Sequence, residues 1–138
     1  MKLITRDTDY AMRALCLIAG QKNDIVSVSW LVRELKIPRP FLRKILQILT
    51  KKGILKSYKG KGGGFVLNVP KEQIFLIDII KAFQGPIGIS QHIFKNKICP
   101  NMKNCKLKKK LDDIEKYIIF KLKDITLSSL SVRGERLQ

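Results

Sequence analysis

The residues best suited to chemistry in this sequence are its three cysteines, Cys16, Cys99 and Cys105. Their number is odd and too small for a disulfide framework. Cys99 and Cys105 lie in a stretch, residues 79–111, that carries many lysines and no acidic residue. Nearby positive charge stabilises thiolates, and thiols close together in a reducing compartment more often indicate metal or redox chemistry. Cys99 and Cys105 are therefore candidate metal ligands or redox-active thiols.

Cys16 and the only histidine, His92, have plainer interpretations. Cys16 follows Asp9 by seven residues and would share a helix face with it, which makes Cys16 a further candidate ligand. A cysteine inside an apolar helix is more often a small buried hydrophobic residue. A lone histidine is likewise more often a surface or hydrogen-bonded side chain than a ligand.

A second set of residues is suited to binding anions. The segment KGKGGG, residues 59–64, contains only lysine and glycine. Its glycines allow a partner to approach the backbone closely, and Lys59 and Lys61 offer positive charge. It is not a nucleotide-binding loop, because no Lys-Ser or Lys-Thr pair follows it. The sequence also has no Ser, His and Asp arrangement and no zinc-type CxxC pair, so we expect no enzymatic activity.

The charge balance of the chain indicates an anionic partner. There are 28 Lys and Arg residues against 11 Asp and Glu residues, a net charge of +17. Between Glu34 and Glu72 lysines and arginines recur, and no acidic residue occurs. Such a protein repels itself unless an anion is part of its function. Nucleic acid is the first candidate.

Two helices are predicted in the first part of the chain. They must help to position the candidate ligands and the basic residues. Apolar spacing predicts a first helix from about Asp9 to Ala19, with Asp7 or Thr8 as its N-cap. A second helix is predicted from Trp30 to about Leu35, with Ser29 as its N-cap.

A third helix, residues 39–52, is predicted after a break at Pro38, with a basic and amide face opposite its apolar face. Two short helices separated by a tight break, the second amphipathic, are typical of a helix-turn-helix. In that motif arginine suits guanine edges and glutamine suits adenine. We therefore expect DNA contacts at Arg39, Pro40, Arg43, Lys44 and Gln47.

A hairpin is predicted next, with strands at residues 54–58 and 64–68 and the lysine-glycine segment at its tip. A hairpin directly after a recognition helix is a wing. Lys59 and Lys61 are expected to meet phosphates or to reach into a minor groove. The predicted fold is mainly α with a small β-hairpin wing: a winged helix-turn-helix DNA-binding domain and a long C-terminal dimerisation helix.

The last part of the chain supplies that dimerisation helix. Apolar residues at intervals of three and four predict one helix from Lys106 to Ile125. Its seam is long for so small a protein, so we expect it to pack on a second copy. The predicted organisation is a DNA-binding domain at 1–84, a cysteine-containing sensor loop at 85–105, and the dimerisation helix and tail at 106–138.

The sequence favours a cytoplasmic protein that does not enter a membrane. It has no apolar run of roughly 18 residues or more. Asp7 and Asp9 stand where a signal peptide would be apolar.

The chain resembles the Rrf-two family of winged-helix bacterial transcription regulators. The resemblance rests on three segments: TDYAMRAL (8–15), PRPFLRKILQILTKKGILKSYKGKGGGFVL (38–67) and CKLKKKLDDIEKYIIFKLKDITLSSL (105–130). It implies a homodimer on a two-fold operator, with the third helix in a major groove and the wing in the flanking minor groove.

The resemblance also implies a cofactor in some members, an iron-sulfur cluster (2Fe-2S or 4Fe-4S) bound by three loop cysteines and a residue of the other subunit. Cys99 and Cys105 match two of the cysteines, whereas Leu111 stands at the third position. Asp9 matches the ligand from the other subunit. The remaining ligand is His92, Asp112 or a second group on the first helix.

These observations predict a DNA-binding transcriptional regulator, a repressor, that senses redox state, nitric oxide or iron-sulfur status through a cluster. One alternative is a cluster-free regulator of the same family that senses thiol oxidation or a protein partner. An alternative of another class is a general basic RNA-binding module, although the sequence has few aromatic residues on which bases could stack.

Overall fold

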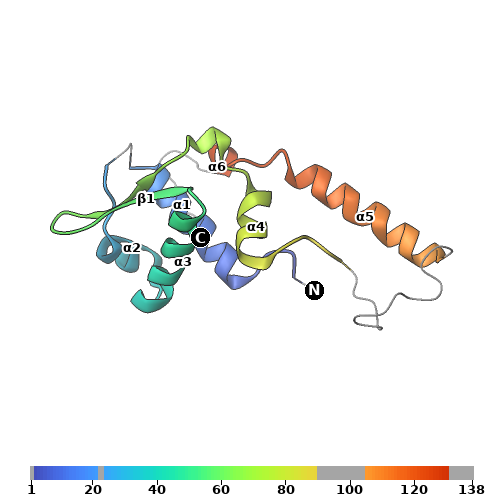
Figure 1. Ribbon diagram of the computed structural model, residues 1–138, viewed down its shortest axis with the longest axis horizontal. Helices are drawn as coiled ribbons and strands as arrows, with labels where there is room; N and C mark the ends of the chain where they lie inside the picture. The colour runs from blue at the N-terminus through green and yellow to red at the C-terminus, as the bar shows by residue number, and fades with distance from the viewer. Residues whose placement is uncertain (1, 22–23, 90–104, 131–138) are drawn as a thin grey trace.

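A computed structural model of the chain describes residues 2–21, 24–89 and 105–130, and its ribbon is shown in Figure 1. Helices dominate, and the strands form a two-stranded antiparallel hairpin. This arrangement confirms the mainly helical fold with a β-hairpin wing. In chain order the elements are α1 (Arg6–Ala19), α2 (Val28–Leu35), α3 (Arg39–Lys51), β1 (Leu55–Tyr58), β2 (Gly64–Leu67), η1 (Lys71–Gln73), α4 (Leu76–Gln84), α5 (Lys106–Leu122) and α6 (Leu127–Leu130).

Helix α1 begins three residues earlier than the predicted start at Asp9, and its N-cap is Thr5 rather than Asp7 or Thr8. The Thr5 hydroxyl accepts a hydrogen bond from the Thr8 backbone N–H at 3.5 Å. Thr8 is the third residue of the helix, and its hydroxyl donates a 2.7 Å hydrogen bond to the Gln84 side-chain oxygen instead. Asp7 and Asp9 fall in the first turn, where negative charge stabilises the helix dipole.

Helices α2 and α3 form the predicted helix-turn-helix. Helix α2 begins two residues before the predicted Trp30, because Ser27 and not Ser29 caps it by accepting from the Trp30 N–H at 3.1 Å. Lys36 ends α2 in the left-handed conformation, with φ at 56°. Helix α3 spans nearly the predicted residues, and the apolar side chains of its inner face are buried: Leu42, Ile45, Leu46 and Leu49.

The wing is joined to the start of α2 as well as to its own strands. Leu55 pairs with Leu67 and Tyr58 with Gly64 along the hairpin. Val26 and Phe65 exchange two backbone hydrogen bonds, each 2.9 Å long. A Cβ atom at Gly64 would lie 2.2 Å from the Val26 carbonyl oxygen, so glycine permits this close approach. The wing is therefore held in a fixed place beside α2.

The predicted helix from Lys106 to Ile125 is too long by three residues. Helix α5 ends at Leu122, and Ile125 instead accepts a backbone hydrogen bond from Leu76 at 2.9 Å. Phe75 and Thr126 form an isolated antiparallel bridge. The chain leaves helical geometry here because these backbone groups pair with the segment before α4.

The core lies between α1, α2, α3, the wing, α4 and α6, and the C-terminal end of α5 reaches it through Leu122, with Ile118 and Ile119 packed beside it. In Figure 1, α5 extends from the α4 and α6 end of the molecule away from the helix-turn-helix. Leu122 is the residue that α5 buries. Four large apolar or aromatic side chains of α5 are at least half exposed: Leu107, Ile114, Tyr117 and Phe120.

Candidate nucleic-acid interface

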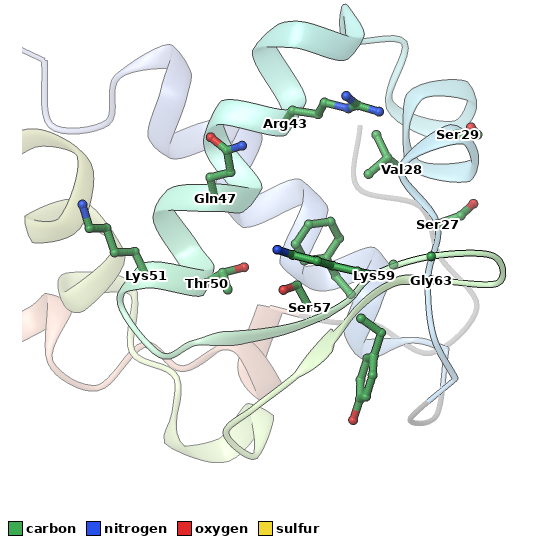
Figure 2. Close-up of a pocket in the computed structure, with 14 residues that line it drawn as sticks. Ser27, Val28, Ser29, Arg43, Gln47, Thr50, Lys51, Ser57, Lys59 and Gly63 are labelled. Atoms are coloured by element: carbon green, nitrogen blue, oxygen red, sulfur yellow. The ribbon is translucent and has the colours of Figure 1, made fainter.

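A groove of about 680 Å³ lies between the start of α2, the outward face of α3 and the wing. Helix α3 contributes Arg43, Gln47, Thr50 and Lys51, the wing contributes residues 57–60 and 63–65, and α2 contributes its first turn. Figure 2 shows labelled side chains of all three elements around this space, with Arg43 and Gln47 projecting from α3. The helix-turn-helix and the wing thus share one concave surface.

The side chains that line the groove are suited to binding an anion. Arg43, Lys51 and Lys59 supply positive charge, and none of the described residues that line it is acidic. The Thr50 hydroxyl donates to the Leu46 carbonyl at 2.8 Å, and the hydroxyl groups of Ser27, Ser29 and Ser57 add neutral hydrogen-bond donors to the groove. Phosphate oxygens accept hydrogen bonds from the cationic groups and from the serine hydroxyls. The same set offers no carboxylate that could hold a metal cation.

The orientation of α2 supports the same chemistry. Ser27 and Ser29 bracket the first helical residue, Val28, so the N-terminal end of α2 opens onto the groove. Backbone N–H groups at a helix N-terminus carry partial positive charge and favour anions. The first turn of α2 contains no acidic side chain that would oppose this effect.

The sequence-predicted DNA residues divide into two groups. Arg43, Gln47 and Lys59 line the groove together. Pro40, Lys44 and Lys61 are exposed but are not among its described lining residues.

Arg39 also lies outside the groove lining and reaches it through Ser29. The Arg39 Nη2 group donates a hydrogen bond of 2.9 Å to the Ser29 hydroxyl. Both side chains are exposed, so this bond lies at the surface. The first residue of the recognition helix is therefore tied to the first turn of α2.

Sequence reasoning missed several groove residues: Ser27, Ser29, Thr50, Lys51 and Ser57. Thr50 and Lys51 follow Gln47 by three and four residues, a helical spacing that extends the polar face of α3 and could have revealed them. Ser27 and Ser29 could not be separated by sequence, because either serine suits an N-cap. Their roles follow only once the position of the wing is known.

The candidate sensor residues are only partly described. Cys105 is the N-cap of α5, and its Sγ accepts a hydrogen bond from the Lys108 N–H at 3.4 Å. Lys108 Nζ lies 2.7 Å from Asp112, and this hydrogen bond raises the pKa of Lys108. Cys99 and His92 lie outside the described residues. Asp112, one of the predicted further ligands, already has a cationic partner.

The two candidates on α1 are also engaged or neutral. Asp9 accepts a 3.0 Å hydrogen bond from the Arg13 guanidinium one turn later. Burial raises the pKa of the Cys16 thiol to about 11, so Cys16 is a neutral, partly buried side chain. This agrees with its interpretation as a small, partly buried hydrophobic residue.

An iron-sulfur cluster needs several thiolate, imidazole or carboxylate ligands close together. Within residues 2–21, 24–89 and 105–130, no three His, Cys, Asp or Glu side chains are grouped so that they could hold a metal ion. The described residues of one protomer therefore do not make up a ligand set. Among the described helices, none has the length and apolar character needed to cross a membrane.

The fold and the groove define a winged-helix transcriptional regulator, and comparison with known proteins agrees. The model of the Rrf2 family, described as an iron-dependent transcriptional regulator, matches residues 4–133. The chain belongs to the Rrf2 family, which confirms the resemblance found in the sequence. Proteins of this family are transcriptional regulators and not enzymes.

Solved structures have the same fold. CymR, the global cysteine regulator of B. subtilis, is 22% identical and matches with a TM-score of 0.79 over 95% of this chain and 97% of that one. IscR of T. potens is 22% identical and matches with a TM-score of 0.70 over 94% of this chain and 85% of that one. At these identities the likeness concerns the fold alone.

Relatives found by sequence are more similar over shorter lengths. A protein of Aquifex aeolicus, named as a candidate HTH-type transcriptional regulator, is 40% identical over 74 residues, which are 54% of this chain and 51% of that protein. Protein aau3 of Rhizobium meliloti is 30% identical over 105 residues, 75% of this chain and 68% of that protein. The chain thus spans about half the length of the Aquifex relative.

Proposed function

We propose that this protein is a sequence-specific repressor of transcription that binds double-stranded DNA as a homodimer. The observation that carries the proposal is the cationic groove shared by α2, α3 and the wing. In a bound complex α3 enters the major groove, with Arg43 and Gln47 toward base edges. Lys59 at the wing contacts the sugar-phosphate backbone beside the adjacent minor groove.

The homodimer is supported by the exposed apolar side chains of α5. Ile114, Tyr117 and Phe120 lie on a helix that extends away from the core of its own protomer. Exposed apolar patches of this kind mark protein interfaces. Packing of α5 against α5 of a second copy covers these side chains and relates the two α3 helices by a two-fold axis. A two-fold operator matches that symmetry.

Sedimentation of the purified protein tests the dimer. Ile114→Glu places a charge in the apolar face of α5 and is expected to give a monomer. Lys116→Gln, an exposed position on the same helix, is the matched control and is expected to remain dimeric. A wild-type monomer at micromolar concentration contradicts this part of the proposal.

The cysteine segment before α5 is proposed as the input of the regulator. Cys105 is the N-cap of α5, and three of the four residues that follow it are lysines. In one form, Cys99, Cys105 and Asp9 of the other subunit hold an iron-sulfur cluster. In the second form, Cys99 and Cys105 respond to thiol oxidation without a cluster. A metal at Asp9 would compete with the surface ion pair that its Oδ2 atom forms with Arg13.

Anaerobic purification followed by an iron assay and an absorption spectrum separates the two forms. Visible absorption with bound iron supports the cluster. A colourless, iron-free protein whose DNA affinity changes with oxidant, and no longer changes in Cys105→Ser, supports the thiol form. DNA affinity that is indifferent to both iron and oxidant removes the sensor proposal and leaves the DNA-binding proposal intact.

Selection from a library of random-sequence DNA duplexes tests the DNA-binding proposal. The wild-type protein is expected to enrich a motif with two related halves, and Arg43→Ala is expected to lose preference within each half. Equal retention of single-stranded RNA and duplex DNA would instead support a general basic RNA-binding module.

A further inference from the structure

We infer that Ser29 is a positioning residue that sets the base preference of Arg39 in the operator. This inference rests on the proposed function and concerns the same surface. Its basis is the 2.9 Å hydrogen bond from the Arg39 guanidinium to the Ser29 hydroxyl, which joins the first residue of α3 to the first turn of α2. No spacing rule in the sequence pairs these two residues, because the turn of the helix-turn-helix separates them.

The position of Arg39 makes its orientation important. Residues at the N-terminal end of a recognition helix contact base edges. An arginine reads guanine through two parallel N–H groups, which requires the plane of the guanidinium to face the O6 and N7 atoms of the base. Arg39 is exposed, so the helix itself does not restrict the long side chain. The hydrogen bond to Ser29 supplies that restriction.

The chemistry of the hydrogen bond leaves Arg39 competent for DNA. Ser29 accepts with a neutral oxygen, so the bond orients the guanidinium without neutralising its charge. One of five N–H donors is engaged, and the others remain for a base or a phosphate. The Ser29 hydroxyl proton is also free to be donated to a phosphate in the groove that Ser29 lines. One serine thus connects the edge of the groove to a base-reading side chain.

Arg43 provides an internal comparison. It lies four residues after Arg39 on the same face of α3 and lines the groove directly. Within the part of the chain that the structure describes, its side chain makes no hydrogen bond. A substitution of Ser29 is therefore expected to affect the operator position that Arg39 reads and to leave the position that Arg43 reads unchanged.

The test is selection of random 30-base-pair duplexes with the full-length wild type and with Ser29→Ala, Ser29→Thr, Arg39→Ala and the double variant Ser29→Ala with Arg39→Ala. Arg39→Ala is expected to remove the base preference at one position in each half of the motif. Ser29→Ala is expected to weaken preference at that position by about 3- to 10-fold, the effect of one hydrogen bond. The double variant is expected to equal Arg39→Ala, and Ser29→Thr, which keeps the hydroxyl, to restore the wild-type preference.

Gln73→Ala is the control, since Gln73 is exposed and lies outside the described lining of the groove. This control is expected to leave the base preference at the operator position read by Arg39 unchanged. Thermal unfolding of each variant verifies that the variant is folded. Two outcomes overturn the inference and leave the proposed function intact. In the first, Ser29→Ala selects the same motif as the wild type. In the second, Ser29→Ala alters the motif at a position that Arg39→Ala does not affect. A wild type that enriches no motif contradicts the proposed function, and the inference with it.

Discussion

The Gln84 side-chain oxygen accepts a 2.7 Å hydrogen bond from the Thr8 hydroxyl, which joins the last residue of α4 to the first turn of α1. Gln84 also accepts from the Thr5 backbone N–H at 3.0 Å and donates to the Leu3 carbonyl at 3.1 Å. Thr8 is fully buried, so this one amide satisfies a polar group inside the core. The cysteine segment begins directly after this junction.

Gln84→Ala is expected to lower the free energy of unfolding by about 1–3 kcal/mol, because the buried Thr8 hydroxyl loses its 2.7 Å acceptor and keeps only the 3.2 Å contact with the Thr5 hydroxyl. Urea denaturation monitored by circular dichroism measures the change. Gln73→Ala removes an exposed glutamine of η1 and serves as the control, with a change within about 0.5 kcal/mol. Equal midpoints for the wild type and Gln84→Ala would show that the junction does not stabilise the fold.

Lys36→Gly is expected to raise the free energy of unfolding by about 0.5–1 kcal/mol. Lys36 has a φ of 56°, which costs roughly 1–2 kcal/mol for a residue with a side chain. Glycine removes that cost but gains freedom in the unfolded chain, so only part of it is recovered. The control is Lys52→Gly, since Lys52 ends α3 with a φ of −80°. A stabilisation of both variants, or of neither, would contradict this account of the turn.

Two glycine substitutions in the wing are expected to differ in cost. Gly60→Ala meets open space and carries only the backbone penalty of a φ of 90°, roughly 1–2 kcal/mol. Gly64→Ala also forces a Cβ against the Val26 carbonyl and is expected to be more destabilising and to separate the wing from α2. Thermal unfolding and duplex affinity report the two effects. An equal cost for both variants contradicts the close approach at Gly64.

The thiol of Cys16 is expected to react slowly with alkylating reagents below pH 9. Burial raises its pKa from 9.0 to about 11, and the thiolate is the reactive form. The neutral thiol stabilises the folded state fully below pH 9, and this contribution is lost as the pH rises toward 11.

Labelling of a variant in which Cys99 and Cys105 are replaced by serine isolates Cys16. The alkylation rate of Cys16 in the folded protein is expected to keep rising between pH 9 and 11. In urea, the alkylation rate of the same variant is expected to have the pH dependence of an ordinary exposed cysteine. Identical pH profiles in both conditions would remove the burial argument.

The sequence alone predicts features that depend on local spacing and composition. The apolar face of α3 follows the helical period and is therefore predictable from the sequence, and the lysine-glycine segment indicates the wing. Thr8 was assigned to a cap because its partner, Gln84, lies 76 residues away. Ile125 fits the spacing of α5 but pairs with Leu76, a contact that periodicity cannot reveal.

The candidate site was predictable only in part, because some of its contacts join residues that lie on different elements. Arg43, Gln47 and Lys59 could be found from the polar face of α3 and the composition of the tip. The hydrogen bond between Ser29 and Arg39 depends on the angle between α2 and α3. That angle is set by the buried side chains of both helices and is not encoded in any short segment.

Duplex affinity as a function of salt concentration tests the central claim most directly. The affinity for a duplex enriched by the wild type is measured by fluorescence anisotropy. We expect log Kd to rise linearly with the logarithm of the salt concentration, with a slope of about 0.9 for each phosphate contact. Lys59→Ala is expected to reduce this slope by about 1 without changing base preference. Lys71→Ala, an exposed lysine outside the groove, is expected to leave the slope unchanged. Affinity that is independent of salt, or an equal slope for Lys59→Ala and the wild type, would contradict binding of DNA in this groove.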